Sequence, residues 1–364
     1  MKIVKPTLVV DLVKAEQNIV RMLNKFRERS IEFRPHFKTH QSLGVAELYR
    51  KNGVTKCTVS SVGMAKYFAD GGWKDICIAF PANILEAKEI NSLAKIVKLY
   101  IIIDSIEKVS LFSAKISANI SLFIEIDTGY FRSGILYDKI HEIRKIINEI
   151  TRYATFTFSG FLSHTGDTYT VNEPKNVLSV FENARRKMVF LKEAFIHDSP
   201  EIIISMGDTP SASLSDNFDG IDEIRPGNFI FYDVMQYVLG SCTKDQIAVA
   251  VYCPVVASYT ERNQLVIYGG AVHLSKEKIV WKDKEIYGFI AIPDESGFGK
   301  IVTGAYLTSL SQEHGIVSFE KGLLEDIKLG DLLAVIPIHS CLTVDLYNEM
   351  IGLDKKSYTK YRTF

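Results

Sequence analysis

The sequence lacks an excess of charge of either sign, and it lacks a long apolar run. Its 43 Lys and Arg residues equal its 43 Asp and Glu residues, and no block of like charge stands out. This balance argues against electrostatic capture of nucleic acid or of an anionic membrane. No segment reaches the ~18 apolar residues that a membrane helix needs. We therefore expect a small-molecule partner, with no nucleic acid and no membrane.

Cysteine is scarce and shows no disulfide pattern. The five cysteines form no CxxC pair and have no disulfide spacing. The apolar run at the N-terminus is broken by Pro6 and stopped by Asp11, which is unlike a signal peptide. These features predict reduced thiols and a cytoplasmic location. We interpret four of the cysteines as core residues and treat Cys341 separately below.

Strand-like and helix-like segments alternate along the first two thirds of the chain. Eight strand-like segments, several of them continuously apolar as in buried parallel strands, lie at residues 32–38, 56–62, 75–80, 98–104, 121–127, 155–164, 201–208 and 223–233. A helix or a long connection follows each of them, which predicts a TIM (β/α)8 barrel. The alternative, a doubly wound open sheet, is less favoured because no GxGxxG motif follows any of these strands.

The pattern changes near residue 245. The later segments are rich in β-branched and aromatic residues and are separated by polar turns. A chain of 364 residues is also long for one domain. We predict an α/β barrel domain at 12–245 and a smaller, mostly antiparallel β domain at 246–364, to which residues 1–11 also belong.

One lysine and two glycine-containing loops indicate a cofactor site. Lys38 follows the first strand in "EFRPHFKTH", and "GDTPS" and "RPGN" follow the seventh strand and interrupt the eighth. Loops of small residues at these two positions are the usual phosphate cradle of a barrel. A lysine amine that faces a phosphate suggests pyridoxal 5'-phosphate, bound as a Schiff base. The alternative is that both loops are ordinary turns and Lys38 is a surface residue.

A second chemical signal lies late in the chain, in "IPIHSCLTVD". If this segment is extended, His339 and Cys341 project from the same side. Imidazole and thiolate together favour zinc, and two ligands can form an open site whose other positions hold water or substrate. The alternative is a buried histidine beside a core cysteine. The segment "SQEHG" at 311–315 could line the same cavity.

Several motifs together resemble the D-serine dehydratase and D-threonine aldolase family. They are "PHFKTH", "EIDTGYFRSG", "GDTPS", "RPGNFIFYD", "SQEHG" and "PIHSCLTVD". Members of this family have an alanine-racemase-type barrel followed by a β domain, the fold type III arrangement of pyridoxal-phosphate enzymes. The resemblance implies Lys38 as the Schiff-base lysine and Arg132 beside the pyridine nitrogen. It implies cofactor contacts from His164, Tyr169, Thr209, Gly227 and Asn228.

The same resemblance implies a divalent metal, zinc or another, on His339 and Cys341, and a head-to-tail homodimer. Aldolases of the family tend to carry an aspartate at the position of Cys341, so the pattern favours a dehydratase that converts D-serine to pyruvate and ammonia. The alternative is a D-threonine aldolase, which releases glycine and an aldehyde. Remoter alternatives are a non-catalytic pyridoxal-phosphate-binding protein and an amino-acid racemase, although the lysine context typical of alanine racemases is absent.

Overall fold

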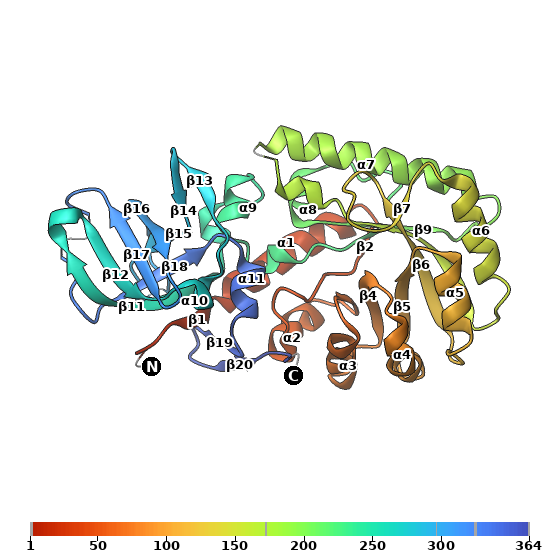
Figure 1. Cartoon of the computed structure of the whole chain (residues 1–364), viewed down its shortest axis with the longest axis horizontal. Helices are drawn as coiled ribbons and strands as arrows, with labels where there is room; N and C mark the ends of the chain where they lie inside the picture. Colours follow the sequence, from red (N-terminus) through yellow and green to blue (C-terminus); the bar gives the residue numbers. More distant parts are fainter. Residues whose placement is uncertain (1–2, 172, 296, 324–325, 363–364) are drawn as a thin grey trace.

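A computed structural model describes residues 3–171, 173–295, 297–323 and 326–362. Figure 1 shows two sheets side by side, with a barrel on the right and a second sheet on the left. The barrel strands are β2 Glu32–Phe33, β3 Lys56–Val59, β4 Asp75–Pro81, β5 Lys98–Ile103, β6 Ile120–Asp127, β8 Phe156–Ser163, β9 Ile203–Met206 and β10 Glu223–Ile224, with the short β7 Ile135–Leu136 beside β6. Their helices are α1 Leu12–Arg27, α2 Leu43–Lys51, α3 Val62–Asp70, α4 Ala87–Ala94, α5 Ile106–Ser113, α6 Ile140–Ile150, α7 Pro174–Phe195, α8 Thr209–Leu214 and α9 Val234–Val238.

The eight parallel strands close into a barrel. They pair in the order β2-β10-β9-β8-β6-β5-β4-β3. The chain after β2 meets β3 through a parallel bridge between His36 and Thr58. There the Phe37 amide donates to Thr58 O at 2.8 Å and the Thr58 amide donates to Pro35 O at 2.9 Å. The predicted barrel is thereby confirmed, with all eight strands in the predicted segments.

The barrel is packed on both faces of its sheet. A small apolar cluster fills part of its interior, and it consists of Cys77, Tyr100, Ile102, Phe123 and Leu162. Outside, α1 buries Ile19, Met22 and Phe26 along one stripe, as its 3.6-residue periodicity predicts. Asp11 caps α1, because its carboxylate accepts from the Val13 and Lys14 amides at 3.1 and 3.0 Å.

The second sheet is mostly antiparallel and follows the order β12-β17-β16-β15-β18-β11-β1-β19-β20, with β12 also paired to β11. Its strands are β1 Thr7–Val10, β11 Val249–Tyr259, β12 Gln264–Tyr268, β15 Gly288–Ala291, β16 Ile301–Leu310, β17 His314–Phe319, β18 Leu332–Pro337, β19 Glu349–Gly352 and β20 Ser357–Thr359. A hairpin of β13 Ile279–Trp281 and β14 Lys284–Ile286 lies beside it, as do the helices α10 Ala271–Leu274 and α11 Ser340–Asp345. The N-terminal strand β1 pairs with β11, as expected. The boundary at residue 245 stays a prediction.

Two local expectations were wrong. The segment "HSCLTVD" is not extended, because His339 is the N-cap residue of α11 and Cys341 lies in its first turn. The eighth strand is also shorter than predicted. It ends at Ile224, and the chain then turns into the 3₁₀ helix η3, Asn228–Ile230.

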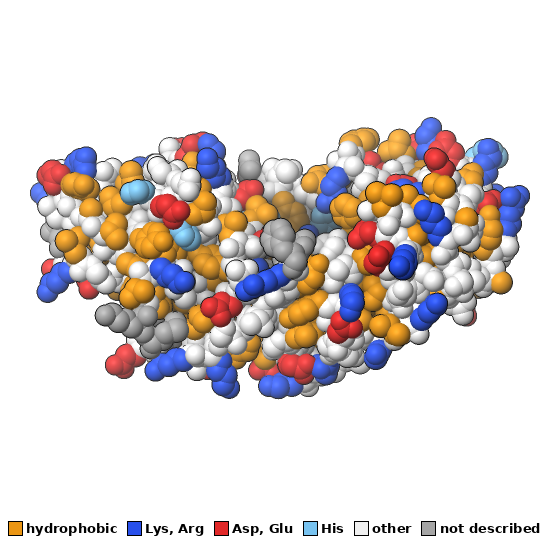
Figure 2. All heavy atoms as spheres, turned by 60° about the horizontal axis from the view of Figure 1, so that its bottom comes forward, with side chains coloured by type: hydrophobic (Ala, Val, Ile, Leu, Met, Phe, Trp, Pro, Cys, Tyr) orange, Lys and Arg blue, Asp and Glu red, His pale blue; other side chains and the backbone are white. Residues whose placement is uncertain are grey.

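Charged side chains of both signs are mixed on the surface. On the face shown in Figure 2, Lys and Arg side chains are interspersed with Asp and Glu side chains. Within the described residues, no helix combines the length and the apolar character that crossing a membrane requires.

Candidate active site

A cavity of about 720 Å³ opens at the carboxyl ends of the barrel strands and reaches α11. This is the end of a barrel at which catalytic residues gather. Eight of the nine predicted site residues line the cavity, namely Lys38, Arg132, His164, Tyr169, Gly227, Asn228, His339 and Cys341. The ninth, Thr209, is buried behind the wall. The fold thus brings together residues that are as far as 303 positions apart in the sequence.

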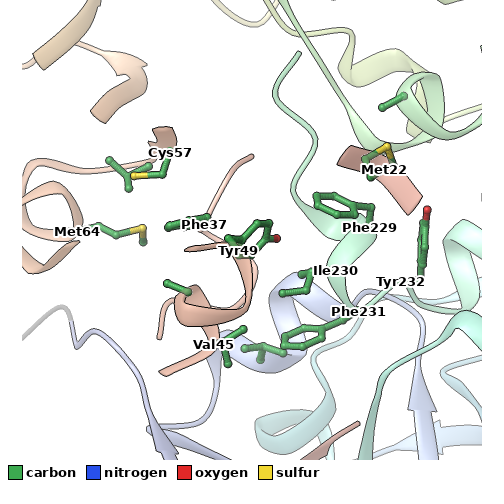
Figure 3. Close-up of a cluster of buried hydrophobic side chains, with 14 of the residues drawn as sticks. Met22, Phe37, Val45, Tyr49, Cys57, Met64, Phe229, Ile230, Phe231 and Tyr232 are labelled. Atoms are coloured by element: carbon green, nitrogen blue, oxygen red, sulfur yellow. The ribbon is translucent and has the colours of Figure 1, made fainter. Parts of the chain in front are cut away.

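The Lys38 side chain is held at the cavity by a rigid turn. On one side of the turn, Phe37 and His40 are fully buried, and their rings lie 5.0 and 5.7 Å from the ring of Tyr49. Figure 3 shows Phe37 beside Tyr49 in this cluster. On the other side, the Gln41 amide donates to Lys38 O at 3.0 Å and to Asp345 Oδ1 of α11 at 2.8 Å. The backbone of the turn is fixed while the amine remains exposed to the cavity.

The two glycines of the predicted phosphate cradle are required by close backbone approach. A Cβ atom on Gly227 would lie 3.0 Å from both Cβ and O of His36. A Cβ atom on Gly207 would lie 2.6 Å from the Arg225 backbone nitrogen, and φ of Gly207 is +157°. Nearby, the buried Ser211 hydroxyl has no hydrogen-bond partner among the described residues. Small residues and an unsatisfied donor are what a phosphate site needs.

Thr209 acts on Tyr169 rather than on the cavity directly. The Thr209 amide donates to the Tyr169 hydroxyl at 3.2 Å, and the Thr209 hydroxyl accepts from the Phe229 amide at 3.2 Å. Burial raises the pKa of Tyr169, so its hydroxyl stays protonated and can donate into the cavity. Through these two hydrogen bonds, Thr209 links the loops that follow β8, β9 and β10.

Two histidines in the cavity wall are held neutral. His164 Nδ1 donates to Gly207 O at 2.8 Å, which leaves Nε2 as an acceptor. Partial burial and the charge of Lys38 lower the pKa of His164 to about 3. Burial and then Lys38 also lower the pKa of His36, whose Nδ1 accepts from the Lys38 amide at 3.2 Å. Neither ring adds positive charge around the lysine.

The sequence did not single out Arg225, a buried guanidinium in the cavity wall. It donates to Ser163 O at 2.9 Å and to the Ser205 hydroxyl. Ser205 donates in turn to Glu223 at 2.5 Å, and Glu223 accepts from Arg34 at 2.6 Å. Arg132, by contrast, is exposed, with its guanidinium 5.4 Å from the ring of Tyr130. The signal that could have identified Arg225 is its place directly after β10 and before "PGN", at the end of a barrel strand.

Glu125 is a second residue that the sequence did not single out. It lies on β6 and is 5% exposed. Oε1 accepts from the Ser133 hydroxyl at 2.8 Å, whereas Oε2 has no partner among the described residues. Burial raises the pKa of this carboxyl group. Alternation along "SLFIEID" turns Glu125 to the same side as the interior residue Phe123, and this alternation could have indicated its position.

The predicted metal pair lies next to the lysine turn. Cys341 Sγ is 3.2 Å from Thr39 Oγ1, and Asn228 Nδ2 donates to the same sulfur at 3.7 Å. Burial opposes ionisation of both groups. The hydrogen bond and charge between them outweigh it, lowering the pKa of Cys341 and raising that of His339. A thiolate beside an imidazole is a donor set that suits zinc.

This pair can supply two ligands at most. Among the described residues, no group of three or more His, Cys, Asp or Glu side chains is arranged to hold a metal ion. Water or substrate would have to complete the coordination, as in an open catalytic site. The "SQEHG" segment does not help, because it lies outside this cavity and Glu313 instead faces His273 at 3.7 Å. The expectation that this segment lines the cavity was therefore wrong.

Comparisons with known proteins agree with the fold. Residues 10–234 match the family model "Alanine racemase, N-terminal domain", and residues 248–353 match the model "Putative serine dehydratase domain". A D-threo-3-hydroxyaspartate dehydratase of Delftia sp. is 28% identical over 350 residues, which cover 93% of this chain and 91% of that protein. Its solved structure gives a TM-score of 0.91 at 25% identity and covers 100% of this chain and 98% of that one.

Two further relatives extend the comparison. A D-serine dehydratase of Dictyostelium discoideum is 28% identical over 371 residues, with 94% of this chain and 91% of that protein covered. A D-threonine aldolase of Arthrobacter sp. is 22% identical over 361 residues, with 95% and 88% covered. Two solved variants of a D-threo-3-hydroxyaspartate dehydratase carry alanine in place of a histidine and of a cysteine two positions further on, and the cysteine variant is in the metal-free form. The chain belongs to the alanine racemase N-terminal domain family and continues into a serine dehydratase domain, like the D-serine dehydratases and D-threonine aldolases that its motifs resemble.

Proposed function

We propose that this protein is a pyridoxal-phosphate- and divalent-metal-dependent lyase of D-β-hydroxy amino acids, and specifically a D-serine dehydratase. The observation that carries the proposal is the meeting of the Lys38 turn with the His339–Cys341 pair in one cavity. Thr39 Oγ1 and Cys341 Sγ are only 3.2 Å apart. An amine that can bind a coenzyme and a donor pair that can bind a cation then act on the same small substrate.

The cavity has the groups that pyridoxal phosphate requires. Lys38 would hold its aldehyde, and the backbone around Gly207 and Gly227 would hold its phosphate. Arg132 remains our proposed partner of the ring nitrogen, and the buried Arg225 is a second candidate for the same role. When bound, the coenzyme supplies an electron sink that stabilises negative charge at the substrate Cα.

The residues of this chain have different roles in moving the α-proton. The Lys38 amine accepts the α-proton, and its fixed turn determines from which side of Cα the proton leaves. The pKa values of His36 and His164 are lowered, so both rings are neutral. They therefore add no positive charge that would repel the ammonium group of an amino acid. The protonated Tyr169 hydroxyl is available as a hydrogen-bond donor. These roles produce selection for one α-carbon configuration, which we propose is D.

The His339–Cys341 pair accounts for the choice of leaving group. The Cys341 sulfur, whose pKa is lowered by His339, and the His339 imidazole would hold a divalent cation, which we propose is zinc. Such a cation supplies Lewis-acid polarisation of the β-hydroxyl. Overall, D-serine loses water, and hydrolysis of the resulting enamine gives pyruvate and ammonia. Water lost in the first step is matched by water consumed in the second.

A D-threonine aldolase is the second candidate, since the Arthrobacter sp. enzyme covers the whole cavity region. It would take the proton from the β-hydroxyl and break the Cα–Cβ bond. Products distinguish the two functions. Purified enzyme incubated with D-serine and with D-threonine should form keto acids, namely pyruvate and 2-oxobutyrate. Formation of glycine and acetaldehyde from D-threonine, with no keto acid from either substrate, would contradict the dehydratase proposal.

We also propose that the protein acts in the cytoplasm as a homodimer. Its five cysteines are free thiols, which suits a reducing compartment. Light scattering of the purified protein tests the dimer, and a mass of one chain, 41.0 kDa, would contradict it.

A further inference from the structure

Lys360 is buried beside the helix that carries Cys341. It is 6% exposed, and it is the only buried lysine among the described residues. Its Nζ donates to Val344 O and, at 2.9 Å, to Tyr347 O. Burial lowers the pKa of Lys360 to about 8, and the carboxylate of Asp345 opposes this shift, so the amine is mostly protonated at neutral pH. Burial of a cation is costly, and the two carbonyl oxygens offset part of that cost.

Helix α11 is held at both ends by other parts of the chain. It has six residues, and a helix this short is unstable without tertiary contacts. At its amino end, the Ser340 amide donates to Asp233 at 2.8 Å. At its carboxyl end, Lys360 binds the carbonyl oxygen of Val344. The position of Cys341 therefore depends on contacts from outside α11.

The segment that carries Lys360 is itself fixed to the barrel. The strand β20, which directly precedes Lys360, lies beside α2 of the barrel (Figure 1). The Tyr361 amide donates to Gln41 O at 2.6 Å, and the Tyr361 ring lies 5.7 Å from the ring of Tyr67. Gln41 in turn donates to Lys38 O. Lys360 thus holds α11 from a segment that also contacts the Lys38 turn.

We infer that Lys360 is a positioning residue, which keeps His339 and Cys341 in place to bind a divalent cation. The inference rests on the proposed function, in which this pair is the metal site. Cys341 and Val344 are three residues apart, so they lie on the same face of α11. Loss of the bond to the Val344 carbonyl would shift that face and move the Cys341 sulfur away from Thr39 Oγ1, which is 3.2 Å from it. Loss of a group that orients a metal ligand lowers metal affinity by about tenfold or more.

The test measures zinc binding to metal-depleted holoenzyme by competition with a chromophoric chelator. Lys360→Met keeps the length of the side chain and removes its charge and its donors, so the zinc dissociation constant should rise at least about tenfold. The coenzyme dissociation constant should stay nearly unchanged, because Lys360 does not line the cavity. Lys360→Gln, which stays polar without the charge, should show a rise as well, and it replaces Lys360→Met if that variant fails to fold.

Lys25→Met is the matched control for a purely structural role. Lys25 is also partly buried, and burial also lowers its pKa to about 8. Its Nζ likewise donates to a helix carbonyl, Ser213 O of α8, at 2.9 Å. Lys25→Met should lower the unfolding temperature and leave the zinc dissociation constant unchanged.

A second readout needs neither metal nor turnover. The Cys341 thiol of metal-depleted holoenzyme is labelled with iodoacetamide, and the labelled peptide is quantified by mass spectrometry. A loosened α11 would take the sulfur away from its hydrogen-bond partners Thr39 and Asn228. Labelling of Cys341 should therefore be at least about threefold faster in Lys360→Met than in the wild type or in Lys25→Met.

The outcomes separate this inference from the proposed function. If D-serine is turned over and zinc binds, but Lys360→Met leaves the zinc dissociation constant unchanged, the role of Lys360 is overturned and the lyase function stands. An equal rise of the zinc dissociation constant in Lys25→Met would also overturn it. If the wild-type protein binds no zinc and turns over no D-β-hydroxy amino acid, the proposed function fails, and the labelling rate alone decides whether Lys360 positions Cys341.

Discussion

Cys341 Sγ lies 3.2 Å from Oγ1 of Thr39, and Thr39 directly follows Lys38 in the sequence. This contact joins the first βα loop of the barrel to the helix that follows β18 of the second sheet. Gln41 reinforces it, because its amide bridges Lys38 O and Asp345 of α11. A substitution in the Lys38 turn should therefore alter the position of Cys341, and a substitution in α11 should alter the position of Lys38.

Loss of Cys341 from the metal pair should slow elimination without unfolding the protein. Cys341→Ala should lower the rate of pyruvate formation from D-serine by at least about tenfold and release bound zinc, because one of two protein ligands is lost. Cys253→Ala, a buried cysteine outside the cavity, is the control. Zinc content is measured by elemental analysis. Full activity of Cys341→Ala after chelator treatment would contradict the metal assignment.

The buried ion pairs of Arg34 should matter for stability. Arg34 is 1% exposed and bonds Glu223 at 2.6 Å and Asp75 at 2.5 Å. Arg34→Met should reduce the free energy of unfolding by about 3–5 kcal/mol, because it leaves Glu223 charged and buried. Arg50→Met, which breaks an exposed pair, should cost at most about 1 kcal/mol. Urea denaturation measures both free energies of unfolding. A loss for Arg34→Met as small as that for Arg50→Met would show that the buried ion pairs do not stabilise the fold.

Gly227→Ala tests the phosphate cradle. Its new Cβ atom would meet His36 at 3.0 Å and push the Lys38 turn away from the loop after β10. We expect coenzyme affinity to fall at least about tenfold, since small displacements at a site are costly. Gly330→Ala is the control, because φ is +90° but no atom lies within 4 Å of the added Cβ. It should lower stability and leave the coenzyme dissociation constant unchanged, and a loss of affinity in this control alone would refute the cradle.

His40 should make stability depend on pH. Its ring is fully buried among aromatic side chains, and burial lowers its pKa to about 3. The unfolded chain binds this proton near pH 6.5, so the free energy of unfolding should fall as the pH drops from about 6.5 toward 3. The slope is about 1.4 kcal/mol per pH unit for one such group. His40→Gln should reduce this slope, and an unchanged slope in this variant would contradict the assignment.

Short, continuously apolar strand segments made much of the barrel predictable. Segments such as β5 and β6 are buried on both faces, so their sequence identifies them as parallel strands without any tertiary information. The position of Lys38 followed from the same order, because catalytic groups lie where barrel strands end. The count of eight strands was therefore enough to place the cavity.

The shape of the metal segment could not be predicted locally. "SCLTVD" is short and contains residues that favour strands, yet it forms α11. The Ser340 amide donates to Asp233 at 2.8 Å, and this carboxylate lies 107 positions away in the sequence. Asp233 also accepts from Asn228 at 2.6 Å. A tertiary capping contact of this kind overrides local propensity, and no pattern within the segment reveals it.

The buried ion pairs could not be predicted from the sequence for the same reason. Arg34 and Glu223 are 189 positions apart, and each alone looks like a polar residue at a strand end. Their pairing, and the place of Arg225 beside them, depends on closure of the barrel between the first and last strands. Only the closed sheet brings β2 next to β10.

The link between Lys38 and the coenzyme is tested most directly by reduction of the holoenzyme with borohydride, digestion and mass spectrometry of the peptides. The account predicts one pyridoxyl-modified peptide, with the modification on Lys38. Modification of a different lysine, or none on any peptide of a holoenzyme that forms pyruvate from D-serine, would contradict it.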